Sequence, residues 1–343
     1  MNGVVKDLSL SVSTESLGSL EDSTILDVRG LYKWFPIRRG FLQRPVAWVH
    51  AVDGVDLEIP RGGTLGLVGE SGCGKSTVGR LVCGLMEPDR GQIRFNGEEI
   101  HGLRGKALRS FRRKVQIVFQ DPYGSLNPRM TVGRMLEEGL EQRGVSNPKE
   151  RRRMAAELLE LVGLPAASRL RYPHEFSGGQ RQRIGIARAL TMEPGLIVCD
   201  EPVSALDVSV QAQIINLLLG LQKEMGLSYL FISHDLHLVR YVSDRVAIMY
   251  GGQIMEWASA ETLEKRVFHP YSQGLLAAVP VADPEARMAL PLLKGEVGTA
   301  IDPPPGCRFQ ARCWLMEKRC REGEIPLYPM DGNLVRCWKV AGK

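Results

Sequence analysis

The chain has 343 residues, of which 44% are hydrophobic and 24% are charged, and its formal net charge is +5. This length fits about two domains and the composition supplies a full hydrophobic core, so we expect a globular protein. No stretch approaches the roughly 18 apolar residues of a membrane span and the N-terminus lacks a signal-peptide pattern, which predicts a cytoplasmic chain whose membrane-spanning partners, if any, are other polypeptides.

The N-terminal part combines a polar tail with two predicted strands. Residues 1–24 are rich in serine, glycine and acidic residues without periodicity, which predicts a disordered tail. Ile25–Val28 and Val49–Ile59 are typical of strands. The segment between these strands is expected to be an exposed excursion, and it contains Arg38, Arg39, Gly40 and Pro45.

A glycine-rich loop follows the predicted buried strand Thr64–Val68 and precedes a predicted helix over Thr77–Met86. It fits the pattern G-x-x-x-x-G-K-[ST], in which backbone N–H groups and a helix N-terminus surround a phosphate. Lys75 is expected to reach the β- and γ-phosphates of ATP, and the Ser76 hydroxyl to bind Mg²⁺. An ordinary glycine-rich turn is the structural alternative. The predicted phosphate loop consists of Gly69, Glu70, Ser71, Gly72, Cys73, Gly74, Lys75, Ser76 and Thr77.

The next segment contains a hairpin signal and clustered positive charge. Gln92–Phe95 followed by Asn96-Gly97 predicts a hairpin, and with the N-terminal strands it predicts an antiparallel sheet beside the nucleotide core. Arg104–Lys114 and Arg151–Arg153 are basic clusters. Either cluster could contact nucleic acid, and a solvated helix surface is the structural alternative.

A helical insert is predicted after the strand Lys114–Phe119, which ends at Gln120. Helices are expected over Val132–Arg143 and over Pro148–Val162, the second capped by the asparagine before it. A helical subdomain therefore spans about residues 121–190.

A second glycine-containing turn opens the predicted helix Arg181–Leu190. Its serine and glycines present backbone donors at a positive helix end, although a serine cap explains them equally well. One chain rarely needs two phosphate sites for one nucleotide. This turn consists of Ser177, Gly178, Gly179 and Gln180.

Two carboxylates follow the apolar run Leu196–Cys199, which predicts that Asp200 and Glu201 lie at the carboxyl end of a central strand. Ligands bind at that edge of open α/β sheets. One carboxylate can hold Mg²⁺ through water while the other orients and deprotonates the attacking water, as phosphoryl transfer requires. A turn containing Asp-Glu is the structural alternative.

The remaining elements predict the fold class. An apolar helical stripe runs from Val210 to Met225, Tyr229–Ile232 is a buried strand, and Arg245–Glu256 is a hairpin. Strands that alternate with helices predict an α/β fold with a mostly parallel sheet covered on both faces.

The order of these motifs resembles that of the ATP-binding-cassette (ABC) ATPases over residues 25–260. The resemblance implies a P-loop NTPase with a RecA-like core, an antiparallel β-subdomain and a helical subdomain. It also implies a head-to-tail dimer, in which each ATP lies between the phosphate loop of one subunit and the Ser177–Gln180 turn of the other. Phe176 stands where the family usually has leucine. The matching motifs are the phosphate loop, Gln120, Ser177 to Gln180, Asp200-Glu201, Ala205-Leu206-Asp207 and Ser233-His234-Asp235.

The same resemblance implies further roles. Gln120 would contact Mg²⁺ or water, His234 would hold the γ-phosphate, and Asp207 would lie across the dimer seam. Phe35, with Trp34 as second choice, would stack on adenine, and a place in the core or on the surface is the alternative for both aromatic residues.

A closer resemblance links the chain to the dipeptide and oligopeptide importer branch of this family. It rests on Asp121-Pro122-Tyr123-Gly124-Ser125-Leu126-Asn127-Pro128, on His269-Pro270-Tyr271 and on Pro303-Pro304-Pro305-Gly306-Cys307. The branch implies a C-terminal extension over residues 261–343 and a place on the cytoplasmic face of the bacterial inner membrane. It also implies three kinds of partner: a second, non-identical ATPase subunit, two transmembrane permeases and an extracytoplasmic peptide-binding protein.

Four cysteines near the C-terminus form a set with the spacing C-x5-C-x6-C-x16-C. A reducing cytoplasm disfavours disulfides, so metal ligation is the natural interpretation. The spacing lacks the C-x2–4-C element of structural zinc sites, and some importers resembling this chain carry a [4Fe-4S] cluster, which we therefore expect in preference to zinc. Four unligated, buried thiols are the alternative. The set consists of Cys307, Cys313, Cys320 and Cys337.

A soluble ABC-type ATPase that acts on nucleic acid is the main alternative function. It would use the basic segment Arg104–Lys114 and a zinc-type cysteine module. Against it, the chain has no second cassette, no coiled-coil insert and no interleaved aromatic and basic residues. A nucleotide-binding scaffold without catalysis is a third hypothesis, and the presence of Lys75, Asp200, Glu201 and His234 opposes it. We therefore expect an ATPase without a nucleic-acid partner, whose transported solute the sequence does not name.

Overall fold

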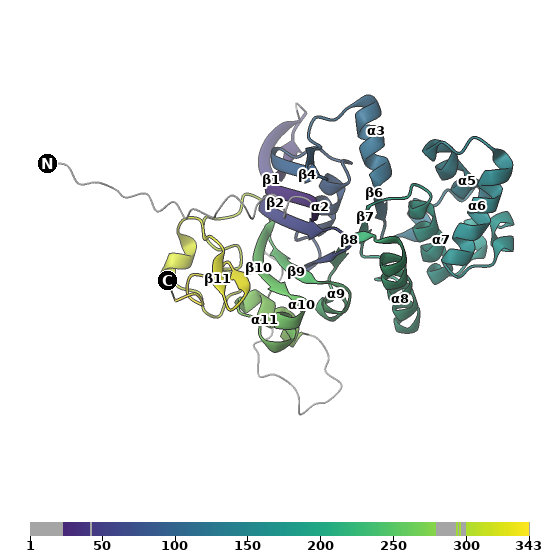
Figure 1. Ribbon diagram of the computed structural model, residues 1–343. Coiled ribbons are helices and arrows are strands. Elements are labelled where there is room, and N and C mark those ends of the chain that lie inside the picture. Colours follow the sequence, from purple (N-terminus) through teal and green to yellow (C-terminus); the bar gives the residue numbers. More distant parts are fainter. Residues whose placement is uncertain (1–22, 42, 279–292, 294, 296–299, 343) are drawn as a thin grey trace.

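The computed structural model describes residues 23–41, 43–278, 293, 295 and 300–342. The predicted tail over residues 1–24 lies almost entirely outside these residues. Two β-sheets form the middle of the molecule, the helices between residues 132 and 190 form one end, and the C-terminal elements lie at the other (Figure 1). Among the described helices, none is long and apolar enough to cross a membrane.

The larger sheet has eight strands, of which six belong to the α/β core. These are β3 (Thr64–Val68), β6 (Val115–Val118), β7 (Leu196–Asp200), β8 (Ser228–Ser233), β9 (Arg245–Tyr250) and β10 (Gln253–Ser259). In the order β9-β3-β8-β7-β6 the strands run parallel, and β10 pairs with β9 in the antiparallel direction. This arrangement confirms the predicted mostly parallel sheet.

Side chains of β7 enter two different hydrophobic cores. Leu196 and Val198 join one core cluster, and Ile197 and Cys199 join the other. Because successive side chains of a strand point to opposite faces, both faces of this strand are buried, which explains its continuous apolar run. Three helices follow core strands, namely α2 (Lys75–Val82), α8 (Val208–Met225) and α9 (Leu236–Val242), and a fourth, α3 (Gly105–Lys114), precedes β6.

The smaller sheet is antiparallel, as predicted, with the order β2-β1-β4-β5. The segment between the two predicted strands is exposed, as predicted, but it is the paired end of a long hairpin, because the pairing of β1 and β2 extends as far as Arg39 opposite Arg44. Register shifts along the hairpin interrupt the alternating pattern, and Pro45 is tolerated because β2 is an edge strand. The strands are β1 (Thr24–Arg39), β2 (Arg44–Pro60), β4 (Arg90–Phe95) and β5 (Glu98–Glu99).

The helical insert follows β6 and forms one end of the molecule (Figure 1). The second of its two predicted helices is capped by Asn147, whose Oδ1 accepts from the Lys149 N–H at 3.0 Å. Gly144 ends the first helix with φ 115°. The insert contains α4 (Pro122–Ser125), α5 (Val132–Arg143), α6 (Pro148–Leu161), η1 (Ala166–Leu170), η2 (Pro173–Glu175) and α7 (Gly178–Leu190).

The C-terminal extension packs onto the α/β core. Its strand β12 (Asn333–Val335) pairs with β10, with Val335 opposite Glu256, and β11 (Tyr328–Met330) pairs with β12. Phe309 and Val335 are fully buried in a core cluster that they share with the parallel strands. The extension thus shares its sheet and its core with the ATPase domain, and the boundary after residue 260 stays a prediction. Its helices are α10 (Ala260–Lys265), α11 (Pro270–Ala277) and η4 (Lys318–Arg321).

Candidate functional site

Four neighbouring parallel strands bring the predicted catalytic residues to one edge of the sheet. The phosphate loop follows β3, His234 follows β8, Asp200 ends β7 with Glu201 directly after it, and Gln120 follows β6. Carboxyl ends of parallel strands meet at the same edge, where open α/β sheets bind ligands. The local patterns in the sequence therefore converge because of the strand order.

Backbone geometry shapes the phosphate loop around Lys75. Gly74 has φ 111°, and a Cβ there would lie 2.0 Å from the Ala51 carbonyl oxygen, so only glycine fits. The Lys75 side chain is buried, and its Nζ donates to the carbonyl oxygens of Gly69 at 2.7 Å and Glu70 at 3.0 Å. Because α2 begins at Lys75, its positive end faces the same loop. The loop thus collects a cation and backbone donors suited to an anion.

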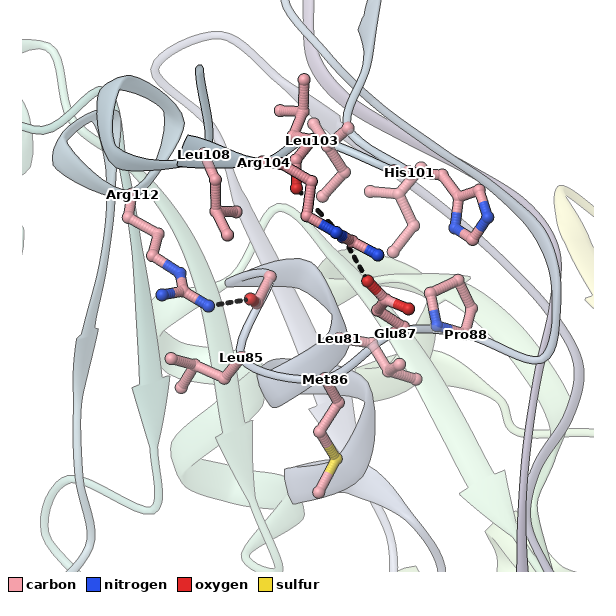
Figure 2. Close-up of a pocket in the computed structure, with 14 residues that line it drawn as sticks. Leu81, Leu85, Met86, Glu87, Pro88, His101, Leu103, Arg104, Leu108 and Arg112 are labelled. Carbon is pink, nitrogen blue, oxygen red and sulfur yellow. Dashed lines mark hydrogen bonds and ion pairs between the residues drawn. The ribbon is translucent and has the colours of Figure 1, made fainter. Parts of the chain in front are cut away.

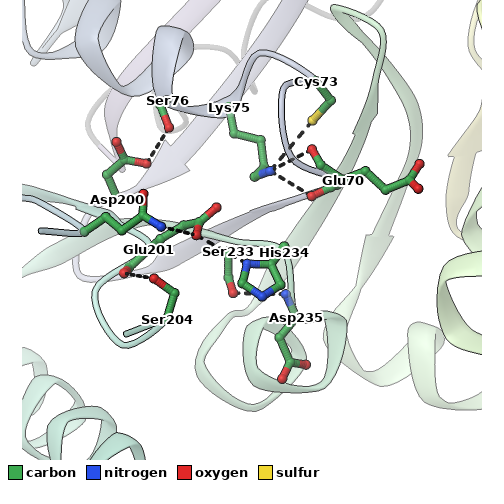
Figure 3. A network of polar contacts seen from close by, with 12 residues as sticks. Glu70, Cys73, Lys75, Ser76, Asp200, Glu201, Ser204, Ser233, His234 and Asp235 are labelled. Atoms are coloured by element: carbon green, nitrogen blue, oxygen red, sulfur yellow. Dashed lines mark hydrogen bonds and ion pairs between the residues drawn. The ribbon is translucent and has the colours of Figure 1, made fainter. Parts of the chain in front are cut away.

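The Ser76 hydroxyl lies beside the first carboxylate. Its Oγ donates to Oδ1 of Asp200 at 2.9 Å, as Figure 3 shows. Burial raises the pKa of Asp200, and the adjacent Glu201 raises it further, while the hydrogen bond from Ser76 lowers it. A divalent cation would offset this cost of holding a buried carboxylate. Hydroxyl and carboxylate oxygens are the ligands that Mg²⁺ prefers, so the donor set fits that ion.

Glu201 is held by two side chains from neighbouring strand ends. Its Oε2 accepts from Gln120 Nε2 at 3.0 Å and lies 3.3 Å from Nδ1 of His234, which is drawn beside it in Figure 3. The Glu201 side chain is 13% exposed, whereas that of His234 is 56% exposed. Glu201 also has φ 49°, a conformation that is uncommon for non-glycine residues and clusters at functional sites.

An open pocket of about 630 Å³ joins these groups. The sequence patterns did not indicate Val49 or Ala51 of β2, which line it. Phe35 lies directly opposite Val49 in the antiparallel pair, so the two side chains stand on the same face of the sheet, although Phe35 itself does not line the pocket. The pocket is lined by Val49, Ala51, Glu70, Ser71, Gly72, Gly74, Lys75, Ser76, Thr77, Gln120, Glu201 and His234.

Trp34, the second choice for stacking on adenine, is engaged elsewhere. Its ring stacks on His50 with centroids 4.3 Å apart, and its Nε1 donates to Asp53 at 2.9 Å. This leaves Phe35 as the better placed of the two aromatic residues.

The second glycine-containing turn is separate from this pocket. Ser177 caps α7, since its Oγ accepts from the Gln180 N–H and the Gln180 side chain accepts in return from the Ser177 N–H. Ser177 and Gln180 are exposed, and so is Asp207, which precedes α8. Neither the Ser177–Gln180 turn nor Asp207 lines the pocket beside Lys75.

Known proteins share both parts of this chain. Residues 52–204 match the family model described as ABC transporter, and residues 255–320 match the one described as oligopeptide/dipeptide transporter, C-terminal region. The oligopeptide transport ATP-binding protein AppF of Bacillus subtilis is 51% identical over 306 residues, which cover 88% of this chain and 93% of the relative. The dipeptide transport ATP-binding protein DppF of Haemophilus influenzae is 46% identical over 323 residues, which cover 93% and 98%.

The chain belongs to the ABC transporter ATP-binding proteins. A solved structure agrees: the ATP-binding cassette MJ0796 in a dimeric post-hydrolysis state with ADP and Pi superposes with a TM-score of 0.61 at 28% identity, over 69% of this chain and 99% of that one. The predicted P-loop NTPase fold and the predicted ATPase activity are therefore confirmed. As a transporter subunit, this ATP-binding protein works with membrane permease partners.

The four C-terminal cysteines of this ABC protein do not form the predicted cluster site. They are four of the residues that line one cavity of about 10 Å³, which has room for no more than a single water molecule. Burial raises the pKa of Cys307 to about 12 and that of Cys313 to about 11. Among the described residues, no group of three or more His, Cys, Asp or Glu could hold a metal ion. The iron–sulfur prediction for Cys307, Cys313, Cys320 and Cys337 is wrong, and zinc has no site there either.

The basic segment offers no support for the nucleic-acid alternative. Arg104 pairs with Glu87, and Arg112 donates to the Gly84 carbonyl oxygen at 2.6 Å. Figure 2 shows both contacts at a hollow of about 220 Å³ between α2 and α3. Leu85 and other apolar side chains line most of this hollow, which does not suit a phosphate backbone. The relatives above are transport proteins, so this alternative function is not supported.

Proposed function

We propose that this ABC protein is the ATP-hydrolysing subunit that powers the import of dipeptides or oligopeptides. It works on the cytoplasmic face of the bacterial inner membrane as the second member of a non-identical ATPase pair. The pair lies beneath two permeases, which receive peptides from an extracytoplasmic peptide-binding protein. The match of residues 255–320 to the oligopeptide/dipeptide transporter C-terminal region carries the peptide assignment, and the names of the relatives support it.

The phosphate loop and its surroundings bind ATP in this proposal. The Lys75 ammonium faces the β- and γ-phosphates, while the N–H groups from Gly69 to Thr77 and the start of α2 surround them. Phe35 stacks on the adenine from the neighbouring β-sheet, which its position opposite Val49 supports. The open pocket beside Lys75 supports this arrangement because it continues from the loop to β2.

Ser76, Asp200 and Gln120 would hold Mg²⁺ at this site. The 2.9 Å contact between Ser76 and Asp200 and the raised pKa of the buried Asp200 support this assignment. When bound, the ion supplies charge neutralisation for the phosphate oxygens.

Glu201 acts as the general base. Its carboxylate orients a water molecule and accepts a proton from it as the water oxygen attacks the γ-phosphate and the bond to ADP breaks. Gln120 and His234 hold the carboxylate at Oε2, which leaves Oε1 for the water. With Nδ1 of His234 directed at Glu201, its Nε2 is available for a γ-phosphate oxygen.

A partner subunit completes each ATP site. The exposed Ser177 and Gln180 present the positive end of α7 to solvent, away from this chain's own pocket. In the proposed head-to-tail pair, the turn formed by Ser177, Gly178, Gly179 and Gln180 contacts ATP bound to the other ATPase subunit, and Asp207 lies at the seam. This accounts for two phosphate-binding turns in a chain with one nucleotide.

Reconstitution in vesicles tests the proposal. The chain, its companion ATPase and the permeases are co-purified, and uptake of a labelled dipeptide and an oligopeptide is measured with ATP and the binding protein. ATP-dependent peptide uptake that Lys75→Ala abolishes is the expected result. ATP hydrolysis without uptake of either peptide, but with uptake of another solute such as a nickel chelate, would keep the ATPase assignment and overturn the peptide assignment.

A further inference from the structure

The C-terminal extension contacts the phosphate loop through an arginine. Arg312 forms a two-pronged ion pair with Glu70, the second residue of the loop: Nη1 lies 2.6 Å from Oε2 and Nη2 lies 3.1 Å from Oε1. The two residues are separated by 242 positions in the sequence. The Arg312 side chain is 6% exposed and the Glu70 side chain 25% exposed, so water screens this pair only from the Glu70 side.

Aromatic residues fix the arginine in this position. The Arg312 guanidinium lies over the rings of Tyr250 and Phe309, with centroid distances of 5.7 and 6.0 Å. Tyr271, from α11, packs against both rings, and its hydroxyl accepts from the Glu70 N–H at 2.9 Å. Both ends of Glu70 are therefore held by residues outside the phosphate loop.

Glu70 presents an electrostatic problem that this contact resolves. Glu70 lines the pocket where the ATP phosphates are expected, and a carboxylate without a cation beside it would repel them. Lys75 does not neutralise it, because Nζ contacts the backbone carbonyls of Gly69 and Glu70 rather than the carboxylate. In the described structure the Glu70 carboxylate instead pairs with Arg312 of the extension.

A second arginine of the extension pairs with an acidic residue of β2, outside the pocket beside Lys75. Arg308 pairs with Asp53 of β2, which also accepts from Trp34. Asp53 lies two residues after Ala51, which lines the pocket. The extension is therefore tied to both the phosphate loop and β2.

We propose that Arg312 is a positioning residue for nucleotide binding, which neutralises Glu70 and turns its carboxylate away from the phosphates. The inference rests on the proposed ATP site at Lys75. It makes the C-terminal extension part of the nucleotide-binding machinery, although none of the extension's described residues lines the pocket. Arg312 acts through its positive charge, which offsets the negative charge of Glu70. Removing the charge of Glu70 should therefore make Arg312 dispensable for ATP affinity.

A double-mutant cycle on the full-length chain tests this role, with the ATP dissociation constant measured by calorimetry at low and high salt. Arg312→Gln should weaken ATP binding about threefold to tenfold at low salt, and by less at high salt. Glu70→Gln should bind ATP at least as tightly as wild type, and the double variant should return to within about twofold of wild type. Arg312→Lys keeps the charge and should lose less than Arg312→Gln. Arg266→Gln, which removes an exposed arginine of the same extension, is the matched control.

Three results would overturn the inference. The first is unchanged ATP affinity in Arg312→Gln, and the second is a double variant that binds ATP as weakly as Arg312→Gln does. The third is weaker ATP binding in Glu70→Gln, which can be measured even if Arg312→Gln does not fold. Thermal unfolding of each variant separates loss of packing from loss of charge neutralisation. The proposed ATP site is tested separately by Lys75→Ala. If Lys75→Ala binds ATP as tightly as wild type does, the assignment of the ATP site fails. If Lys75→Ala binds ATP weakly but Arg312→Gln binds it normally, only the role of Arg312 is excluded.

Discussion

Gln120 donates a hydrogen bond from Nε2 to Oε2 of Glu201 at 3.0 Å, and this contact joins the carboxyl ends of the neighbouring strands β6 and β7. His234, at the end of β8, lies 3.3 Å from the same oxygen. A carboxylate held at one oxygen by two side chains has a defined orientation before any nucleotide binds. Because Gln120 begins the connection to the helical insert, a movement of that insert would alter the orientation of Glu201 directly.

Glu201→Gln should leave ATP binding intact and lower turnover by about 10²–10⁴-fold, because an amide keeps the shape of the side chain but cannot accept the proton. Turnover is measured as phosphate release from the assembled complex, and binding by calorimetry. Glu138→Gln, on the exposed face of α5, is the control. Turnover of Glu201→Gln close to that of wild type would assign the base to another residue.

Ser177→Asp tests whether a partner completes the ATP site. Aspartate caps a helix as well as serine does, so α7 should remain stable, but its negative charge would face the phosphates of ATP bound to the partner subunit. We expect unchanged ATP affinity of the isolated chain and at least about a tenfold loss of hydrolysis in the assembled complex. Ser177→Asn keeps the cap without the charge and should lose less. Equal hydrolysis by isolated wild-type chain and by the complex would contradict completion in trans.

Phe35→Ala should weaken ATP binding about twofold to tenfold, the range expected for loss of one aromatic stacking contact. Trp34→Phe, which loses the hydrogen bond to Asp53, should instead lower the melting temperature while ATP affinity changes little. Calorimetric titration with ATP and thermal unfolding of both variants distinguish these effects. The opposite pattern would assign adenine stacking to Trp34.

The predictable part of this protein is the part that local sequence encodes. The phosphate loop and the Asp200-Glu201 pair follow apolar runs that fix the ends of β3 and β7, and the parallel strand order then brings them together. The contact between Glu70 and Arg312 could not be predicted, since no local pattern links residues 242 positions apart. The cysteine spacing was misleading for a related reason: ligation depends on how the fold places the thiols, and no group of three or more described His, Cys, Asp or Glu residues could hold a metal ion.

His269 makes a buried hydrogen bond in the C-terminal extension that protonation of its side chain should disrupt. It is completely buried, and its Nδ1 accepts from the Tyr271 N–H at 3.0 Å as the N-cap of α11. Burial, aided by the positive charge of Arg336, lowers the pKa of His269 to about 3. A protonated Nδ1 could not accept this hydrogen bond. The nearby Glu256 behaves oppositely, since burial raises the pKa of its carboxyl.

His269→Asn should reduce the acid sensitivity of folding. In the unfolded chain the imidazole titrates near its ordinary value of 6.5, but in the folded chain only near 3. Because the pKa is lower in the folded chain, the contribution of neutral His269 to the free energy of unfolding is complete above pH 6.5. It is lost as the pH falls toward 3, by about 1.4 kcal/mol for each pH unit in that window. Asparagine can cap α11 without titrating. Glu256 is present in both proteins, so the effect of its titration on stability cancels when the two are compared. Denaturant unfolding at pH 7.5, 6.5 and 5.5 should therefore show a smaller loss of stability in the variant than in wild type, and parallel losses in the two proteins would exclude His269 as the source.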